Sequence, residues 1–459
     1  MTFTLTGTQL LDRLATDLDG TLVRPGDRDW DTARQAWHLA VDQRPAAVVL
    51  AETVRDVQQV VLTAARAGLR VAPQSTGHNA GPLGALDETN LLKMSGMRGV
   101  RIDPEARLAR VEAGALWMDV TPAAAKHGLA ALAGSAPDVG VAGYTLGGGL
   151  SWLARSHGLA ANSVVALEVV TADGEVRRVD AEHDTDLFWA LRGGGGSFGI
   201  VTALEFRLFP ITEVYAGVLF FPITRAAEIL NAWRAWLPSV PDSVTSIGRL
   251  LKFPPLPELP PHLSGQSYVV VEATCQLDAA EAEALLAPLR ALGPALDTFR
   301  GHAVEELSQL HMDPDGPVPG YGDGMLLRDL PAEAVEAFAR FAAPDVPLLS
   351  VELRHLGGAL TPGRMSGGAV DGIDAAFAMF AVGIAPNAAV MQAVQAAVTA
   401  AQHAMAPWST GGCYVNFAER RKSGAALFGA ATYARLRAVK AAFDPADVIR
   451  ANHPVPPAA

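Results

Sequence analysis

Two charged side chains, Glu352 and Arg354, lie two residues apart in the β-rich stretch 348–356 of this 459-residue chain. Side chains alternate between the faces of a strand, so Glu352 and Arg354 share one face and His355 lies on the other. Two charges on one face of a central strand need either a polar cavity or each other. A carboxylate in a cavity can accept a proton near neutral pH, whereas a pair with Arg354 would be structural. The sequence leaves both interpretations open.

A turn-rich loop, residues 75–81 (Ser-Thr-Gly-His-Asn-Ala-Gly), directly follows a predicted strand over 70–74. Backbone N–H groups of a loop in this position can converge on phosphate oxygens. A helix is predicted over 53–68, because apolar residues recur at helical spacing behind a Thr53-x-x-Asp56 capping box. The order helix, strand, loop therefore predicts a candidate phosphate-binding site.

Two segments match sequence motifs of other enzyme classes. Residues 17–22 spell the nucleophile loop of haloacid dehalogenase-type phosphatases, in which Asp17 would attack phosphorus and Asp19 would act as acid and base. That loop should follow a buried strand, but residues 11–16 are typical of an amphipathic helix end. Residues 194–199 contain Gly-x-Gly-x-x-Gly, yet a helical stretch precedes them and a strand follows, the reverse of the order that a dinucleotide-binding turn needs. A phosphatase using Asp17 remains a minor alternative.

Composition limits the class of protein and of partner. Half of the residues are apolar and 18% are charged, which indicates an ordered protein of two or three domains. The net charge of −12 opposes binding to nucleic acid and to anionic lipid. Two cysteines, Cys275 and Cys413, cannot form a zinc site, and no His-Glu-x-x-His is present, so no metal is predicted. Residues 1–9 do not resemble a secretory signal and no apolar run could span a membrane, so a cytoplasmic protein is predicted.

The chain changes character near residue 209. Before it, helices and strands alternate, with strands predicted over 166–171 and 200–209 and glycine clusters at 140–149 and 193–199. From 209 to about 410, strands such as 267–274 are separated by alanine-rich helices, which indicates a second domain. The proline-rich segment 252–261 is typical of a rigid connector. The tail 411–459 is predicted as a strand and then a helix over 432–443 that could return to the first domain.

Several segments together resemble the berberine bridge enzyme-like group of FAD-linked oxidases, within the vanillyl-alcohol oxidase/p-cresol methylhydroxylase (PCMH) superfamily. They are Arg44-Pro45, the Gly77-His78 loop, residues 139–152, residues 186–202, the Tyr-Val-Asn-Phe of 414–417 and the Phe-Asp-Pro of 443–445. Their order and spacing cover nearly the whole chain. Within the group, residues 356–359, the proline-rich segment and 411–417 are most similar to EncM-like bacterial flavoproteins of polyketide biosynthesis, which implies a role in secondary metabolism.

The resemblance implies an α+β, two-domain flavoprotein. It places a PCMH-type FAD-binding domain over 1–208 and the returning tail 411–459, and an inserted substrate domain over 209–410 with an antiparallel sheet flanked by helices. The loop 75–79 would hold the pyrophosphate, the 140–149 cluster would lie against the flavin, and 200–201 would meet the adenine side. The implied cofactor-binding residues are Ser75, Thr76, Gly77, His78, Asn79, Gly140, Gly143, Tyr144, Gly147, Gly148, Ile200, Val201, Asn416 and Asn452.

His78 occupies the position of the family's flavin-linking histidine. A neutral imidazole nitrogen can add to the activated 8α-methyl group of the flavin ring. Some members carry a second, cysteinyl link, but Ala136 stands at that position here. The resemblance therefore implies FAD attached once, through His78.

The family's reaction moves a hydride from a substrate C–H bond to flavin N5 while a base removes the O–H or N–H proton, and O2 usually reoxidises the flavin. Glu352 and Tyr414 are both candidates for the base, since Phe417 replaces the second tyrosine of the family's Tyr-x-Asn-Tyr segment. Arg354 and His355 are candidate substrate-binding residues. The expected partners are O2 and a small molecule, either an alcohol, a sugar or a natural-product intermediate, and the protein is expected to be a monomer or homodimer. The alternative is a flavoprotein whose FAD is structural and whose pocket directs a non-redox cyclisation or only binds a ligand.

Overall fold

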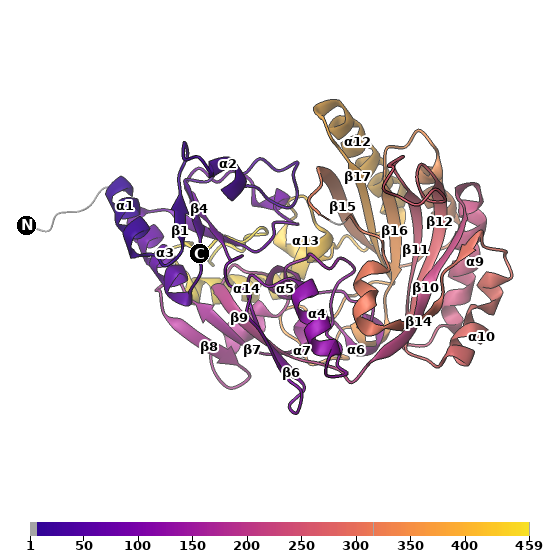
Figure 1. Ribbon diagram of the computed structural model, residues 1–459, viewed down its shortest axis with the longest axis horizontal. Coiled ribbons are helices and arrows are strands. Elements are labelled where there is room, and N and C mark those ends of the chain that lie inside the picture. The colour runs from indigo at the N-terminus through magenta and orange to yellow at the C-terminus, as the bar shows by residue number, and fades with distance from the viewer. Residues whose placement is uncertain (1–6, 315, 459) are drawn as a thin grey trace, which may run out of the picture.

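The computed structural model describes residues 7–314 and 316–458, and these form two domains side by side (Figure 1). Strands up to residue 207 belong to one domain, and strands from 213 to 384 belong to the other. The predicted α+β, two-domain fold is confirmed. Of residues 1–9, for which the sequence predicts no secretory signal, residues 1–6 lie outside the described part.

The first domain opens with a four-stranded sheet of order β1-β2-β4-β3. Its strands are β1 (Thr21–Val23), β2 (Ala47–Leu50), β4 (Thr89–Lys93) and β3 (Arg70–Gln74), and its helices are α1 (Gly7–Asp17), α2 (Trp30–Ala33) and α3 (Val54–Ala67). β2, β4 and β3 run parallel, so α3 connects β2 to β3 across the sheet. The predicted capping box is present, because the Thr53 hydroxyl accepts the N–H of Asp56 at 3.2 Å and the Asp56 carboxylate accepts the N–H of Thr53 at 3.1 Å.

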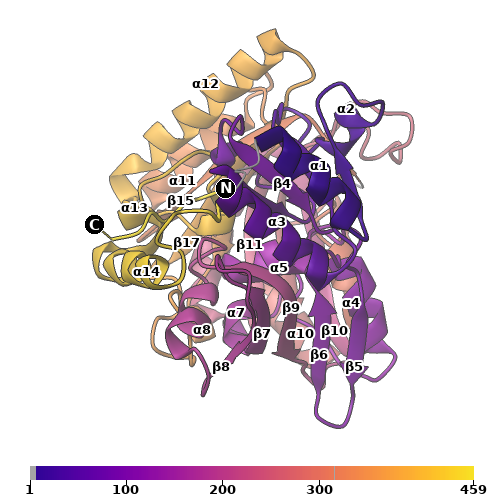
Figure 2. The ribbon, with the colours of Figure 1, turned by 90° about the vertical axis from the view of Figure 1, so that its left-hand side faces the viewer.

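A second, antiparallel sheet completes this domain, in the order β5-β6-β9-β7-β8. Its strands are β5 (Val100–Asp103), β6 (Leu108–Glu112), β7 (Val164–Val170), β8 (Val176–Asp180) and β9 (Ile200–Arg207). The helices here are α4 (Trp117–Ala125), α5 (Val141–Leu146), α6 (Ala154–His157), α7 (Ala160–Ser163) and α8 (Thr185–Leu191). Figure 2 shows this sheet below α3 and β4. Since α8 precedes the glycine cluster and β9 follows it, the order predicted for residues 186–207 is confirmed.

The second domain is built on a large antiparallel sheet whose path is β13-β10-β12-β11-β16-β17-β15, with β14 paired to β10. Its strands are β10 (Glu213–Pro222), β11 (Val244–Lys252), β12 (Ser267–Cys275), β13 (Leu296–Asp297), β14 (Arg300–Ala303), β15 (Gly320–Leu327), β16 (Ser350–His355) and β17 (Phe377–Ile384). The helices are α9 (Ala226–Trp236), α10 (Ala279–Arg290), α11 (Ala332–Ala339) and α12 (Ala388–Met405). Val351 and Leu353 of β16 pack in one apolar cluster with Trp233 of α9 and Phe338 of α11. Helices therefore cover one face of the sheet, and the alternate residues of β16 point to the other.

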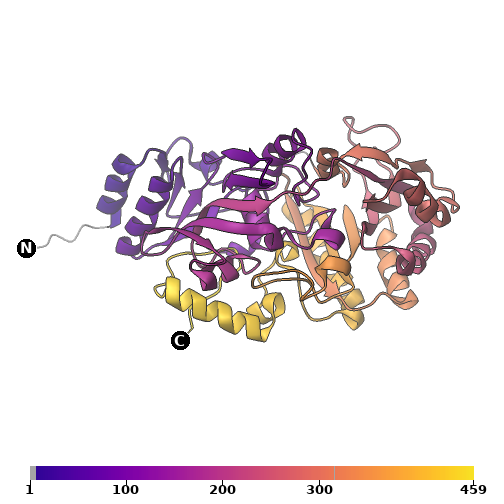
Figure 3. The same cartoon turned by 90° about the horizontal axis from the view of Figure 1, so that it is seen from below.

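The chain returns to the first domain after the large sheet, where α13 (Gly424–Phe428) and α14 (Ala430–Phe443) lie beside it (Figure 3). Leu436 of α14 belongs to the core of that domain. The buried ammonium of Lys440 donates to the carbonyl of Ser197 at 2.9 Å and pairs with Asp444 at 2.6 Å. The strand predicted at the start of the tail is wrong, because the structure has a short 3₁₀ helix at Val415–Phe417 and no strand within 411–417.

The phosphatase-like motif at residues 17–22 has a structural environment that differs from a phosphatase nucleophile loop. Asp17 ends helix α1 instead of following a buried strand, so the phosphatase alternative is wrong. The buried Asp56 carboxylate accepts the N–H groups of Asp19 at 2.8 Å, Gly20 at 3.2 Å and Glu52 at 2.9 Å, besides that of Thr53. One side chain thus fastens the segment before β1 to the start of α3.

We expect Asp56→Ala to lower the free energy of unfolding by about 3 kcal/mol or more, because several backbone N–H groups lose their acceptor and each such loss costs about 1–3 kcal/mol. Urea denaturation followed by circular dichroism measures the change. Asp29→Ala is the control, since Asp29 is exposed and makes no capping hydrogen bond. Equal unfolding midpoints for the two variants would contradict this role of Asp56.

Candidate active site

A cavity of about 1500 Å³ lies between the two domains. Its lining on one side comes from the loop after β3, from α5 and from residues 414–417, and on the other side from β11, β16 and β17. Pockets for drug-sized ligands measure about 300–1,000 Å³. This cavity therefore has room for a large ligand together with a second molecule.

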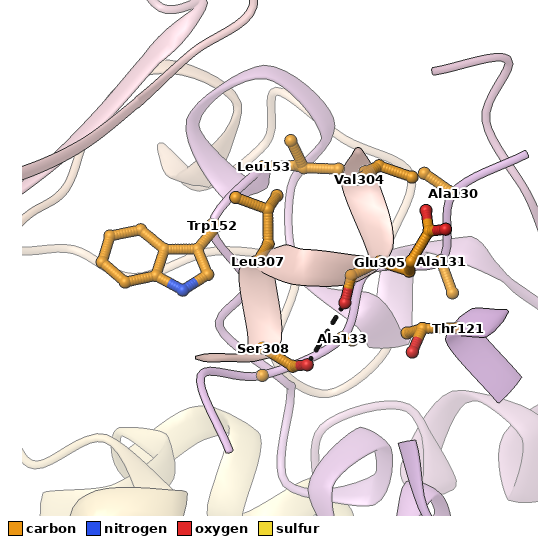
Figure 4. Close-up of a pocket in the computed structure, with 11 residues that line it drawn as sticks. Thr121, Ala130, Ala131, Ala133, Trp152, Leu153, Val304, Glu305, Leu307 and Ser308 are labelled. Carbon is orange, nitrogen blue, oxygen red and sulfur yellow. Dashed lines mark hydrogen bonds between the residues drawn. The ribbon is translucent and has the colours of Figure 1, made fainter. Parts of the chain in front are cut away.

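A second hollow, beside α4 and the 3₁₀ turn Val304–Gln309, measures only about 20 Å³. Figure 4 shows its wall of small and apolar side chains, among them Ala133 and Leu307. The Ser308 hydroxyl at its edge already donates to the carbonyl of Glu305 at 3.3 Å. Such a space holds about one water molecule, so it is no substrate site.

Residues 75–79 form the loop at the end of β3, and all of them line the large cavity. Their backbone N–H groups donate to no backbone carbonyl among the described residues, whereas the carbonyls of Thr76 and Gly77 accept the N–H groups of Trp37 and His38. Gly77 has a φ of +85°, which favours glycine. Free N–H groups in a cavity-lining loop fit phosphate oxygens, as the sequence predicts.

Two glycines let other segments approach the cavity wall more closely than any side chain would allow. A Cβ atom at Gly140 would lie 2.4 Å from the Ser75 hydroxyl, and one at Gly147 would lie 1.9 Å from the amide oxygen of Asn416. Real Cβ atoms do not approach other atoms so closely. The glycine cluster after residue 139 therefore brings the loop 75–79 and the C-terminal segment together around one wall of the cavity.

The buried Tyr414 joins the C-terminal segment to this wall. Its hydroxyl accepts the N–H of Gly149 at 2.8 Å and the side-chain amide of Asn416 at 3.0 Å, and Asn416 also donates to the carbonyl of Tyr144 at 2.9 Å. Burial raises the pKa of Tyr414 above its ordinary value, and the two hydrogen bonds that it accepts offset only part of this effect. The phenol is therefore protonated at neutral pH.

His78 lies in a shaped surrounding at the cavity. Its ring stacks on Trp37 with ring centres 3.9 Å apart, and its Nδ1 lies 2.7 Å from the Thr76 hydroxyl. Its Nε2 lies 3.5 Å from a carboxylate oxygen of Asp138, whose other oxygen accepts the Trp37 indole N–H at 2.5 Å. Burial raises the pKa of Asp138, but His78 and Trp37 lower it more, so this carboxylate is ionised. The imidazole is thus held in one plane beside an anion.

A cluster of buried charges faces the cavity from the large sheet. Glu352 pairs through Oε1 with Arg354 Nε at 2.8 Å and through Oε2 with His311 Nε2 at 2.8 Å. The other ring nitrogen of His311 lies 2.6 Å from Glu272, and Glu272 pairs with Arg249 at 3.1 Å. Arg354 also lies over the ring of Phe417, 5.0 Å from its centre. Glu352 and Arg354 thus form an ion pair and also line the cavity.

The pairing fixes the charges of this cluster. Burial raises the pKa of Glu352, but Arg354 and His311 outweigh it and hold the pKa well below its usual range. Burial and Arg249 lower the pKa of His311, but the nearby carboxylates of Glu272 and others raise it to about 9. Glu352 is thus an anion and His311 a cation at neutral pH.

Most residues predicted for the site line this one cavity. They are Ser75, Thr76, Gly77, His78, Asn79, Gly140, Gly143, Tyr144, Gly147, Val201, Glu352, Arg354, Tyr414, Asn416 and Asn452. Ala136, at the position of the missing cysteinyl link, lines it as well.

Three predicted residues lie outside the cavity lining, namely Gly148, Ile200 and His355. The prediction of His355 as a substrate contact is corrected here, because alternation along β16 turns it away from the face of Glu352. Its ring lies 5.9 Å from that of Phe377, and burial lowers its pKa to about 3, so it is a neutral, packed histidine. Ile200 is fully buried, while its neighbour Val201 lines the cavity.

The sequence gives little warning of the partners of Glu352. Glu272 is the one charged residue of the apolar strand β12, and Arg249 lies inside β11, whose other cation, Lys252, is at the strand end. A charge inside a buried strand is a signal in itself. His311 lies in a loop after the 3₁₀ turn and has no pattern around it. Trp37 and Asp138 are likewise brought to His78 only by the fold.

Two family models of known proteins match segments that line the cavity on the side of the first domain. A model described as an FAD binding domain matches residues 45–180, and a model described as berberine and berberine like matches residues 413–456. The first contains the loop 75–79 and α5, and the second contains Tyr414 and Asn416.

Curated relatives extend this match. (R)-6-hydroxynicotine oxidase of Paenarthrobacter nicotinovorans is 30% identical over 345 residues, which are 72% of this chain and 70% of the relative. The chain belongs to the berberine bridge enzyme-like family of FAD-linked oxidoreductases. Xylooligosaccharide oxidase of Thermothelomyces thermophilus is 33% identical over 216 residues, which are 46% of this chain and 44% of that protein. The protein is thus an FAD-linked oxidoreductase of a family that includes oxidases.

Solved structures of the family have the same fold. BBE-like 1 of Physcomitrella patens aligns with a TM-score of 0.83 at 22% identity, over 99% of this chain and 100% of that one. 6-Hydroxy-D-nicotine oxidase of Arthrobacter nicotinovorans aligns with a TM-score of 0.80 at 25% identity, over 94% of this chain and 96% of that one. The residues around the cavity fit FAD, since the loop 75–79 offers free N–H groups and the glycine wall offers close approach.

Within residues 7–314 and 316–458, no group of histidine, cysteine and acidic side chains could hold a metal ion. In the same part of the chain, every helix is too short or too polar to cross a lipid bilayer.

Proposed function

We propose that this protein is an FAD-dependent oxidase that removes a hydride from a small-molecule substrate, with O2 as the final acceptor. One observation carries the proposal: the ionised Glu352 and its partner Arg354 line the same cavity as the free N–H groups of loop 75–79. Residues 1–208 and 411–459 would form the FAD-binding domain, and residues 209–410 the substrate domain. The names of the relatives favour an oxidase over a protein in which FAD is structural and directs a non-redox cyclisation.

The cofactor site is assigned by the chemistry of its residues. The N–H groups of loop 75–79 would hold the pyrophosphate, and the close approach at Gly140 and Gly147 would leave a flat wall for the ring system. Bound FAD would supply a hydride acceptor at N5 and, through O2, its own reoxidation. We assign the covalent link to His78 alone, because Ala136 has no nucleophilic atom.

Trp37 and Asp138 would prepare His78 for this link. Stacking on Trp37 fixes the plane of the imidazole, and the Asp138 carboxylate 3.5 Å from Nε2 stabilises a proton on that nitrogen. Nδ1 then keeps its lone pair, which is the form that can add to a carbon atom. The Thr76 hydroxyl, 2.7 Å from Nδ1, can donate to this lone pair until the bond forms.

We assign the base to Glu352 and a positioning role to Tyr414. Glu352 is ionised at neutral pH, so its carboxylate can accept the substrate proton as the hydride leaves. Tyr414 keeps its proton and uses its oxygen to hold the N–H of Gly149. Arg354, whose guanidinium lines the cavity, would bind the substrate oxygen and stabilise the negative charge that develops there.

The first test concerns the link. Acid precipitation of the purified protein should leave flavin in the pellet, and His78→Ala should release all of it to the supernatant, because the imidazole is the only nucleophile assigned to the bond. His403→Ala, which changes an exposed histidine of α12, should keep flavin in the pellet. Flavin that stays with precipitated His78→Ala would contradict the assignment.

The second test concerns the base. Glu352→Gln should slow anaerobic flavin reduction by about 10²–10⁴, the usual loss on removal of a general base. Tyr414→Phe should stay within about tenfold of the parent, since it loses only a positioning contact. Glu258→Gln is the control, because Glu258 is exposed at the edge of the same cavity. Stopped-flow spectra of flavin reduction give these rates, and a large loss in Tyr414→Phe alone would transfer the role to tyrosine.

The third test uses pH. The reduction rate of the parent protein should not fall between about pH 8 and pH 5, because Arg354 and His311 hold the pKa of Glu352 well below this range. His311→Asn removes a cation 2.8 Å from the carboxylate, so the pKa of Glu352 should rise and the rate should fall on the acid side. Parallel pH–rate profiles measured by stopped flow decide this. Identical profiles would show that His311 does not act on Glu352.

A further inference from the structure

The half of the cavity that belongs to the substrate domain has a mostly hydrocarbon wall. Leu251 of β11, Val382 and Ile384 of β17, and Phe253, Leu256 and Leu263 of the loop between β11 and β12 all line it. This loop, residues 253–266, contains most of the proline-rich segment 252–261, which the sequence suggests is a rigid connector. Here it serves as a wall of the cavity.

The loop is held in shape by its own hydrogen bonds. The N–H of Phe253 donates to the carbonyl of Gln266 at 2.9 Å, and the Ser264 hydroxyl donates to the carbonyl of Leu256 at 2.8 Å. Leu256 is 46% exposed and yet lines the cavity, so it lies at the rim. Because the apolar rim is already ordered, binding an apolar ligand there costs little conformational entropy.

The cationic side chains of β11 that line the cavity already donate hydrogen bonds to protein groups. The Lys252 ammonium donates to the carbonyls of Ala343 and Val346 at 2.5 and 2.9 Å. Arg249 donates to Ser350, to Glu272 and to the carbonyl of His311. A saccharide carries a hydroxyl on most carbons, and each buried hydroxyl without a partner is costly.

The positive and negative charges around Glu352 are equal in number. Arg249 and Glu272 pair, Arg354 and Glu352 pair, and the cationic His311 lies near Asp313, which helps to raise its pKa. A charged substrate group would enter this cluster without a counter-ion of its own. A neutral polar group faces no such cost.

We propose that the substrate is a neutral alcohol on a largely hydrocarbon body, whose hydroxyl lies at Glu352 and Arg354 and whose body lies along Leu251 and the loop 253–266. The inference rests on the proposed oxidase function and adds the class of substrate to it. In the reaction the alcohol would lose a hydride from carbon and a proton from oxygen, the proton going to Glu352, and become a carbonyl compound. Bound FAD would supply the hydride acceptor, and O2 would take up the two electrons and both hydrogens and leave as H2O2.

The experiment titrates flavin-loaded protein without oxygen and follows the flavin spectrum. The probes are butan-1-ol, hexan-1-ol and octan-1-ol, the charged analogues octanoate and octylamine, and the saccharide xylobiose. Affinity should rise with tail length, by up to about fourfold for each added methylene group, and both charged analogues should bind more weakly than octan-1-ol. Xylobiose or a charged analogue that binds more tightly than octan-1-ol, or an affinity independent of tail length, would overturn the inference.

Two variants test where the apolar body of the substrate binds in the cavity. Leu256→Ser should weaken octan-1-ol binding by threefold or more and leave butan-1-ol almost unchanged, because only the longer tail reaches the rim. Met118→Ser is the matched control, since Met118 is 47% exposed on α4 and does not line the cavity. Unchanged octan-1-ol binding in Leu256→Ser would remove the loop from the site and overturn the inference.

The oxidase function and the substrate class are tested by different measurements. Bleaching of the flavin by an alcohol reports the oxidase function, whereas the order of affinities reports the substrate class. If affinity rises with tail length but no alcohol bleaches the flavin, the apolar class stands and the oxidase function fails for these alcohols. If xylobiose alone bleaches the flavin, the function stands and the substrate class is wrong.

Discussion

The large sheet depends on one constraint: a group of charges is buried in it and must be paired. Arg249, Glu272, Glu352 and His311 are each at most 3% exposed. Removing such groups from water costs several kcal/mol for each, which only close pairing and hydrogen bonding offset. Arg249 stands directly opposite Glu352 in the β11–β16 pairing. A slip of one residue would turn one set of charges toward the helix-covered face, so the cluster fixes strand register as well as chemistry.

The opposite wall of the cavity is assembled by a different kind of contact. The C-terminal segment reaches the first domain through Tyr414 and Asn416, which bond to Gly149, Tyr144 and each other. These contacts need a wall without Cβ atoms, and the glycine cluster provides it. A rigid charged face and a close-packed glycine face thus meet across one cavity. Both domains line the cavity, and the returning C-terminal segment contributes Tyr414 and Asn416 to it.

Local patterns in the sequence predict well what local forces decide. The capping box of α3, the loop after β3 and the shared face of Glu352 and Arg354 follow from spacing alone, and the structure has all three. Long-range contacts are different. His311 enters the charge cluster from a loop with no periodicity. Tyr414 was expected on a strand but lies before a 3₁₀ turn, where its hydroxyl accepts the N–H of Gly149 and the side-chain amide of Asn416. Sequence spacing carries no information about partners that the fold brings together from distant parts of the chain: His311 is 39 residues from Glu272, and Tyr414 is 265 residues from Gly149.

The pairing that keeps Glu352 ionised also makes it a weak base, and this limits the order of events at the site. A carboxylate with a lowered pKa cannot take a proton from a free alcohol to any useful extent. The oxygen becomes far more acidic as a hydride leaves the neighbouring carbon, since the product of that step alone would be a protonated carbonyl group. In the proposed reaction, proton transfer to Glu352 therefore has to accompany the departure of hydride and cannot precede it. Arg354 lines the cavity, and its Nε lies 2.8 Å from the Glu352 carboxylate. It is therefore placed to stabilise the substrate oxygen and the carboxylate oxygen during the proposed proton transfer.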